Sequence, residues 1–236
     1  MRTALSSFKS SSIRPLASRV EGRRRSNQPC RDVRRRHTAS VNVLDVDHYR
    51  DRMNQANWAE ELARKHLEAP LPRRWAHVQG VAARARVLAP ILSDDADLLE
   101  AAAWLHDIGY SPELAETGFH PLDGARYLRD AHFADPVLCS LVAHHSCAVI
   151  EAEERGLASE LRREFPAASM VLNDALAYCD MTTDPSGNMV SVHDRLAEIR
   201  ERYGPHSIVT RFTHNAEPCL IASVKRTNCR LLPSAT

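Results

Sequence analysis

Apolar residues recur at intervals of three and four positions along most of the chain after Asn57, with polar residues between them. This spacing is typical of amphipathic α-helices, whereas the strict alternation that marks strands is missing. We therefore predict an all-α fold, built as a compact bundle of helices. The expected helices span residues 58–67, 73–92, 94–106, 120–128, 136–145, 169–180 and 191–203, with one outer helix or a pair across 151–165.

Capping signals support two of these boundaries. Ser93, followed by Asp94 and Asp95, has the pattern of an N-cap with acidic residues in the first turn, where they suit the helix dipole. Asp135 precedes Pro136, and proline is favoured at the first helical position. We expect a new helix to begin at each place.

The first forty residues differ from the rest in charge. They hold ten Arg and one Lys against Glu21 and Asp32, a net +9 in a chain whose total is +1. We expect residues 1–52 to be a basic extension, either disordered or placed ahead of the true translation start, with a transit peptide as the alternative. We assign residues 53–210 to the helical domain and residues 211–236 to a C-terminal helix or tail.

Composition also limits the partners and the location. Without its basic tail the chain is mildly acidic, which argues against a specific nucleic-acid surface on the domain. No apolar run approaches the ~20 residues of a membrane span, and no secretory signal is evident. The six cysteines form no Cys-x-x-Cys pair, and reduced thiols suit a cytoplasmic protein. The oligomeric state cannot be read from the sequence.

Histidines and aspartates lie within otherwise apolar helical segments. The pair His106–Asp107 lies where one such segment ends. Two polar side chains are unfavourable at the end of an apolar segment unless they bind something there. The other members are His77, His120, His144, His145 and Asp180. Imidazoles and carboxylates suit Fe, Mn, Co, Ni or Zn better than Mg or Ca, and one carboxylate can bridge two ions. We predict one or two divalent transition-metal ions, with Asp107 as the bridge.

The order of these residues resembles a known signature. His77, then His106–Asp107 within Leu-His-Asp-Ile-Gly, then Asp180 is similar to the H…HD…D pattern of the HD-domain metal-dependent phosphohydrolase superfamily. His120 and the His144–His145 doublet resemble the additional ligands of its HDIG-type, binuclear branch. That branch includes HD-type diadenosine tetraphosphate hydrolases and the cyclic-di-GMP phosphodiesterases of the HD-GYP class. The resemblance covers about residues 73–181 and implies a helical bundle that presents its ligands to an open cavity.

The resemblance also implies roles for individual residues. One ion would be held by His77, His106, Asp107 and Asp180. The second would be held by Asp107, His120 and one histidine of the doublet, where the spacing of the preceding apolar residues favours His144 over His145. As candidate catalytic residues we name Asp107, His120 and, apart from the resemblance, Arg126. Arg126 is one of four candidate phosphate contacts, with Arg73, Arg74 and Arg84.

The implied reaction is hydrolysis of a phosphomonoester or phosphoanhydride by a hydroxide formed from a metal-bound water. Ser146-Cys147-Ala148 stands where the cyclic-di-GMP class has an acidic residue and Gly-Tyr-Pro, and the Glu-Asp pair of the (p)ppGpp hydrolases is not evident. The expected partner is therefore a small phosphorylated, nucleotide-like molecule. Two alternatives stay open: a mixed-valent di-iron oxygenase on the same scaffold, and a non-catalytic HD signalling module.

Overall fold

The computed structural model describes residues 55–232, and the expected basic extension at residues 1–52 lies outside them. The predicted fold class is confirmed, because the described part is helical with one isolated β-bridge, Thr183 to Met189, and no strand. The α-helices are α2 (Gln55–Leu67), α3 (Pro72–Leu92), α4 (Ala96–Leu105), α5 (His120–His132), α6 (Pro136–His144), α7 (Ala148–Arg155), α8 (Ala158–Glu164), α9 (Met170–Met181), α10 (Val192–Tyr203) and α11 (Ile208–Leu231). The 3₁₀ turns are η1 (Ser93–Asp95), η2 (Ile108–Tyr110) and η3 (His145–Cys147).

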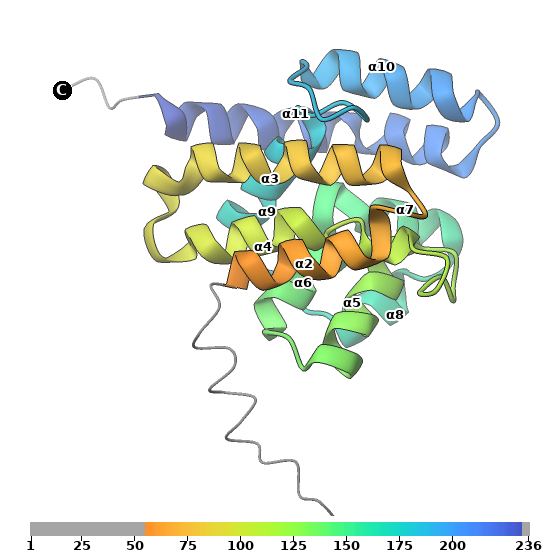
Figure 1. Cartoon of the computed structure of the whole chain (residues 1–236). Helices are drawn as coiled ribbons and strands as arrows, with labels where there is room; N and C mark the ends of the chain where they lie inside the picture. Colours follow the sequence, from red (N-terminus) through yellow and green to blue (C-terminus); the bar gives the residue numbers. More distant parts are fainter. Residues whose placement is uncertain (1–54, 233–236) are drawn as a thin grey trace, which may run out of the picture. The chain divides into compact units, whose positions relative to one another are not determined.

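Helix α4 lies at the centre of the domain. Residues 101–105, Ala-Ala-Ala-Trp-Leu, are all buried. A helix that is apolar on nearly all sides has to be surrounded, and α4 packs against α2, α3, α6 and α9 (Figure 1). Its C-terminal end, which the His106–Asp107 pair follows, is therefore delivered into the interior.

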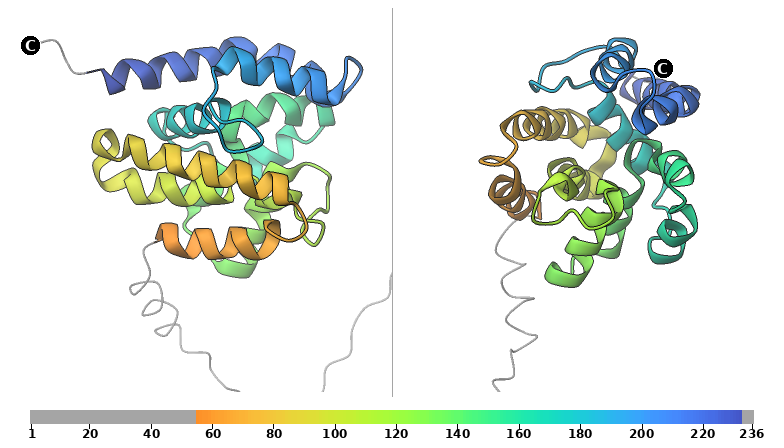
Figure 2. Two further views of the ribbon diagram at one scale, coloured as in Figure 1. Left: turned by 45° about the horizontal axis from the view of Figure 1, so that its top comes forward. Right: turned by 90° about the vertical axis from the view of Figure 1, so that its right-hand side faces the viewer.

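Helices α10 and α11 run side by side along one edge of the domain, as Figure 2 shows. Between them and α9 lies a small apolar cluster that includes Leu196, Ala216 and Leu220. An ion pair fastens α11 to α9, because Arg226 Nε and Nη2 donate to the buried Asp174 carboxylate at 2.7 and 2.6 Å. The chain beyond residue 208 is thus helical as far as Leu231.

One of the two predicted helix starts is confirmed and the other is wrong. The Asp135 side chain accepts hydrogen bonds from Val137 N and Leu138 N at 2.7 and 3.3 Å, which confirms this helix start. The start at Ser93 is wrong, since α4 begins at Ala96 after the 3₁₀ turn η1. Ser93 has a φ of 50° and its N–H donates to the carbonyl of Ala89, so it ends α3 instead of opening α4. Serine serves in turns as readily as in caps, and the sequence does not distinguish the two uses.

Of the two alternatives for residues 151–165, the structure shows a pair, α7 and α8. Gly156 separates them with a φ of 73°, a left-handed conformation that closes many helices and favours glycine. None of the described helices is both long enough and apolar enough to cross a bilayer.

Candidate metal centre

The predicted ligands converge in the interior of the domain from separate elements. They are His77 in α3, His106 directly after α4, Asp107 ahead of η2, His120 at the start of α5, His145 in η3 and Asp180 near the end of α9. All are buried except His120, whose side chain is 12% exposed. Polar groups buried so deeply need partners, and here they have mainly one another.

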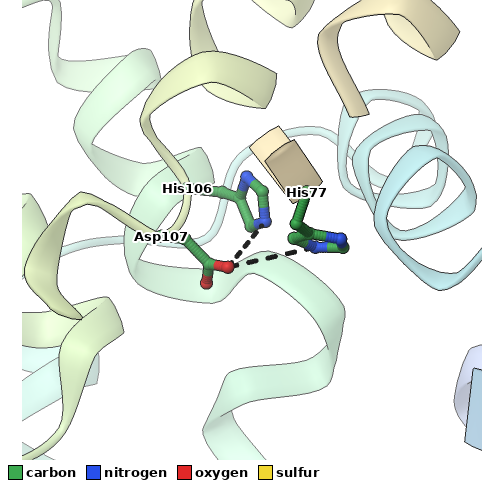
Figure 3. A group of neighbouring side chains, drawn as sticks. All are labelled: His77, His106 and Asp107. Atoms are coloured by element: carbon green, nitrogen blue, oxygen red, sulfur yellow. Dashed lines mark ion pairs between the residues drawn. The ribbon is translucent and has the colours of Figure 1, made fainter. Parts of the chain in front are cut away.

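Two groups of ligand atoms share Asp107. Its Oδ2 lies 3.3 Å from His106 Nε2 and 3.9 Å from His77 Nε2 (Figure 3). Its Oδ1 lies 3.3 Å from His120 Nε2 and 3.9 Å from His145 Nε2. Within each group the three ligand atoms all lie within 4.8 Å of one another. Each carboxylate oxygen thus faces its own pair of imidazoles, as a carboxylate between two ions would.

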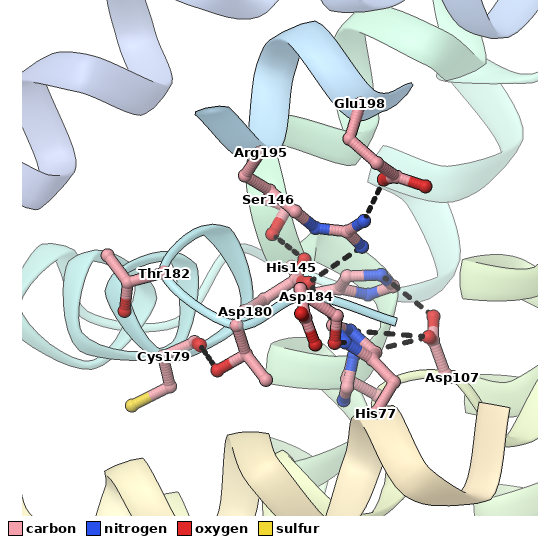
Figure 4. A network of polar contacts seen from close by, with 12 residues as sticks. His77, Asp107, His145, Ser146, Cys179, Asp180, Thr182, Asp184, Arg195 and Glu198 are labelled. Atoms are coloured by element: carbon pink, nitrogen blue, oxygen red, sulfur yellow. Dashed lines mark hydrogen bonds and ion pairs between the residues drawn. The ribbon is translucent and has the colours of Figure 1, made fainter. Parts of the chain in front are cut away.

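Asp180 belongs on the side of the first group. Its Oδ1 lies 3.0 Å from His77 Nε2 and 4.0 Å from His106 Nε2. Its Oδ2 accepts a hydrogen bond of 2.5 Å from Ser146 Oγ (Figure 4). Ser146 therefore fixes the orientation of the carboxylate and leaves Oδ1 to the cluster.

Backbone carbonyls set the tautomers of three imidazoles. The Nδ1 atoms lie 3.0 Å from Asp184 O for His77, 2.8 Å from Ala103 O for His106 and 2.7 Å from Val142 O for His145. A carbonyl can only accept a hydrogen bond, so each Nδ1 carries the proton and each Nε2 keeps its lone pair in the neutral ring. All three Nε2 atoms face the carboxylates. Backbone partners of this kind orient metal-binding histidines.

The cluster fits a metal ion, as the surroundings of His106 show. Its Nε2 is buried and has no hydrogen-bond partner in the described part of the chain, although Asp107 Oδ2 is only 3.3 Å away. A lone pair beside a carboxylate is repelled unless positive charge stands between them. Burial alone would lower the pKa of His106, but the negative charges of Asp107 and Asp180 outweigh burial and raise it. The surroundings of Nε2 therefore favour a positive charge at this place. Nitrogen and carboxylate donors suit a divalent transition metal.

Burial and charge also set the ionisation of the other members. Burial disfavours the charged carboxylate of Asp107, but nearby positive charge, led by Arg74, outweighs burial and holds its pKa well below the ordinary value. The pKa of Asp180 is lowered by a similar balance. Burial lowers the pKa of His120 to about 3 and lowers that of His145 as well. Ionised carboxylates and neutral imidazoles are the states in which these groups bind metal.

The two histidines of the doublet point in different directions. Helix α6 ends at His144, whose Nε2 donates to Phe165 O at 2.7 Å. Ser146 and Cys147 then adopt φ angles of 48° and 60°, and this break in the backbone sets the direction of His145. The structure brings His145, not His144, to the cluster, which reverses the preference drawn from apolar spacing.

Arg74 and Tyr110 lie against the cluster. Arg74 Nη1 donates to Asp107 Oδ2 at 2.6 Å, and its guanidinium lies 4.0 Å from the centre of the Tyr110 ring. Tyr110 in turn stacks on His120 with ring centres 3.8 Å apart. Within residues 110–119, Tyr110 is the residue that lines the cavity.

Arg126 is not part of the cluster. Its guanidinium is bound by two glutamates of α8, Glu160 and Glu164, with Nε to Glu164 Oε2 at 3.0 Å. The structure therefore gives no support to the expected catalytic role of Arg126, since Glu160 and Glu164 engage its Nε and Nη2 away from the cluster. Arg84 donates to Thr182 O at 3.3 Å. Of the four candidate phosphate contacts, Arg74 is the one that touches a predicted ligand.

Sequence reasoning missed Arg195 of α10. Its side chain is 4% exposed, its Nη1 donates to Glu198 Oε2 at 2.6 Å, and its Nη2 lies 4.0 Å from Asp180 Oδ1 (Figure 4). A signal was present, because Arg195 lies three residues after Val192 and four before Ile199, on the apolar face of the helix. An arginine on that face needs a buried partner.

A cavity of about 70 Å³ opens onto the cluster. Its walls include the ligands Asp107, His120, His145 and Asp180. Arg74 and Arg195 also line it, so cationic side chains and the carboxylates share one space. The cavity has room for a few water molecules or a phosphoryl group beside the ligands.

Comparison with known protein families identifies the domain that contains the cluster. The sequence matches the HD domain over residues 74–197, a range that contains every ligand of the cluster and also Arg195. Neither a search of curated proteins nor a search of solved structures returned a match.

Proposed function

The chain belongs to the HD domain family, and from this premise we propose that it is a metal-dependent phosphohydrolase of the binuclear, HDIG type. Its substrate is a small phosphorylated, nucleotide-like molecule, cleaved at a phosphomonoester or phosphoanhydride bond. The supporting observation is the set of three imidazoles whose Nδ1 atoms are held by backbone carbonyls while their Nε2 atoms face Asp107 and Asp180.

The residues would form two metal-binding positions. His77, His106 and Asp180 would hold one ion, His120 and His145 would hold the other, and Asp107 would contact both. Divalent ions so placed lower the pKa of water and neutralise charge on a phosphoryl group. The candidate ions are Fe, Mn, Co, Ni and Zn.

The arginines would position the substrate. Arg74 sits on the Asp107 carboxylate and lines the cavity, so that its remaining N–H groups can bind phosphoryl oxygens. The Tyr110 ring contacts both the Arg74 guanidinium and the His120 ring, and it therefore helps to hold both groups in place. A phosphoryl group in the cavity would thus lie between a cation and the ligand cluster, where its charge is stabilised before the bond breaks.

Elemental analysis of protein purified without chelator, combined with a screen of nucleotides and phosphomonoesters, tests the proposal. We expect up to two transition-metal ions per chain and metal-dependent release of phosphate. Asp107→Ala should remove bound metal and lower turnover by more than roughly 100-fold, the upper end of the effect of outer-shell partners. Asp94→Ala, in the exposed turn η1, is the matched control and should retain both.

The alternatives give different results in the same experiments. Wild-type protein without transition metal, or Asp107→Ala with wild-type phosphatase activity, would refute the proposal. Consumption of oxygen by an iron-loaded protein that releases no phosphate would indicate the oxygenase alternative. A signalling module would show neither reaction, and the retention of every buried ligand argues against it.

A further inference from the structure

A second cavity adjoins the metal centre and differs from the first in its charge. Its volume is about 280 Å³. It is lined by Pro70, Leu71, Pro72, Arg73, Arg74, His77, Pro185, Arg195 and Arg202. No acidic residue is among them, whereas four arginines are. Because Arg74, Arg195 and Arg202 also line the first cavity, the two cavities meet at these side chains.

The arginines of the second cavity have too few counter-charges. Three of them depend on Glu198, which lies 2.6 Å from Arg195 Nη1, 3.4 Å from Arg202 Nε and 4.0 Å from Arg73 Nη2. Arg195 also lies at 4.0 Å from Asp180 Oδ1, but that carboxylate already faces His77. One carboxylate thus serves three guanidinium groups, and the cavity retains positive charge.

One donor in this group has no acceptor at all. The Nε of Arg195 is buried and makes no hydrogen bond in the described part of the chain, and the residue is 4% exposed. A buried N–H of a charged group without a partner is costly, and native proteins rarely leave one unless a water or ligand supplies the acceptor. The unpaired Nε therefore needs an acceptor, and an oxygen of a bound anion would supply one.

We propose that the second cavity binds a second phosphoryl group of the substrate, which makes the substrate a diphosphate or a bisphosphate. This inference rests on the proposed function, since the first phosphoryl group lies at the metal centre. Guanidinium groups match phosphoryl oxygens in charge and geometry, and proline and leucine walls strengthen the attraction by excluding water. Its volume of about 280 Å³ leaves room for a phosphoryl group together with the linker that joins it to the first one.

Binding of non-hydrolysable probes to the full chain, as purified, tests this inference by calorimetry. Methylphosphonate carries one phosphoryl group, and alkylene diphosphonates with one to three carbons between the phosphorus atoms carry two. The best diphosphonate should bind at least roughly tenfold more tightly than methylphosphonate, the gain expected from hydrogen bonds to a second charged group. It should also bind more tightly than phosphonoacetate, which offers a carboxylate in place of the second phosphoryl group.

Two variants locate the effect. Arg202→Gln should reduce the preference for diphosphonate by about tenfold. Arg73→Gln, whose side chain lines the second cavity and not the first, should reduce it severalfold and leave the binding of methylphosphonate unchanged. Arg200 belongs to α10, as Arg202 does, but its side chain lines neither cavity. Arg200→Gln should therefore behave as wild type. The variants keep the same His/Asp cluster, so the contribution of bound metal is common to all of them.

The experiments distinguish failure of the second phosphoryl site from failure of the proposed function. No preference for any diphosphonate in the wild type, a preference untouched by both cavity variants, or equal binding of phosphonoacetate would overturn the second phosphoryl site. Hydrolysis of monophosphates could persist in each of those cases, and the proposed function would stand. Conversely, a strong preference for diphosphonate in a protein without metal would support the cavity and refute the hydrolase.

Discussion

Replacing Gly109 by alanine tests how closely α5 must approach the His106–Asp107 pair. A Cβ on Gly109 would lie 2.1 Å from His120 O and 2.7 Å from Gly124 N. Both are backbone atoms of α5, so no side-chain rotation relieves the clash. The first contact has to widen by about 1.4 Å to reach the ~3.5 Å at which nonbonded atoms ordinarily meet.

The displacement acts directly on the metal centre, because His120 is the first residue of α5 and moves with it. Its Nε2 now lies 3.3 Å from Asp107 Oδ1, and metal sites tolerate errors of about 0.2 Å in ligand distance. Gly109→Ala should therefore lose about one ion per chain, from the group that contains His120. Overpacking should also cost roughly 1–3 kcal/mol, which lowers the melting temperature by about 2–12 °C for a domain of this size.

The assay is elemental analysis of the purified variant together with thermal unfolding. Gly156→Ala is the matched control, because Gly156 has a φ of 73° and a Cβ there would meet nothing within 4 Å. It should lose about 1–2 kcal/mol through backbone strain and keep its metal. If Gly109→Ala kept wild-type metal content and stability, the close approach of α5 would be refuted. Equal metal loss in both variants would show that the metal reports stability and not the position of His120.

Three further predictions concern groups outside the cluster. Burial lowers the pKa of His66 from 6.5, so the folded protein binds its proton less well than the unfolded chain and loses stability as the pH falls below 6.5. His66→Gln should shrink the difference between urea midpoints at about pH 7.5 and about pH 5.5, and an unchanged difference would contradict this origin. A hydrogen bond from Cys147 lowers the pKa of the exposed Cys219 to about 6, so iodoacetamide should alkylate Cys219 first among the described cysteines. Cys147→Ala should slow that alkylation, as measured by peptide mass spectrometry, and an equal rate would exclude the hydrogen bond as its cause. Asp174→Asn weakens the ion pair with Arg226 of α11 and should cost about 1–3 kcal/mol in urea unfolding without loss of metal; loss of metal would show that α11 supports the cluster.

The ligands could be predicted from the sequence because their chemistry conflicts with their surroundings. His77 and Asp180 stand in helices whose neighbouring residues are apolar, and burial of such groups needs a reason that packing does not supply. The fold class followed from the same apolar spacing, which is strong in segments such as 73–92. The fold class depends on periodicity alone, and the ligand set depends on residue type together with the resemblance to the H…HD…D signature; neither requires knowledge of side-chain direction.

Side-chain direction is what the sequence could not supply. The choice between His144 and His145 depends on the positive φ angles of Ser146 and Cys147, and neither residue type announces such a conformation as glycine or asparagine would. Arg195 was missed for a different reason. Its spacing from Val192 and Ile199 places it on the apolar face of α10, but the many charged residues of that helix obscure the signal.

The position of the cluster at helix ends explains the state of its histidines. The last carbonyls of a helix lack N–H partners from a following turn, and His106 and His145 each donate Nδ1–H to the carbonyl three residues earlier, those of Ala103 and Val142. The helix end therefore fixes the tautomer, and the tautomer leaves Nε2 free to bind a cation. Helices α4, α6 and α9 all end at or beside a ligand of the cluster, and the C-terminal end of a helix carries partial negative charge. A cation among the ligands is thus favoured by the same backbone geometry that orients the rings, so the short segments after α4 and α6 contribute to this site together with the ligands themselves.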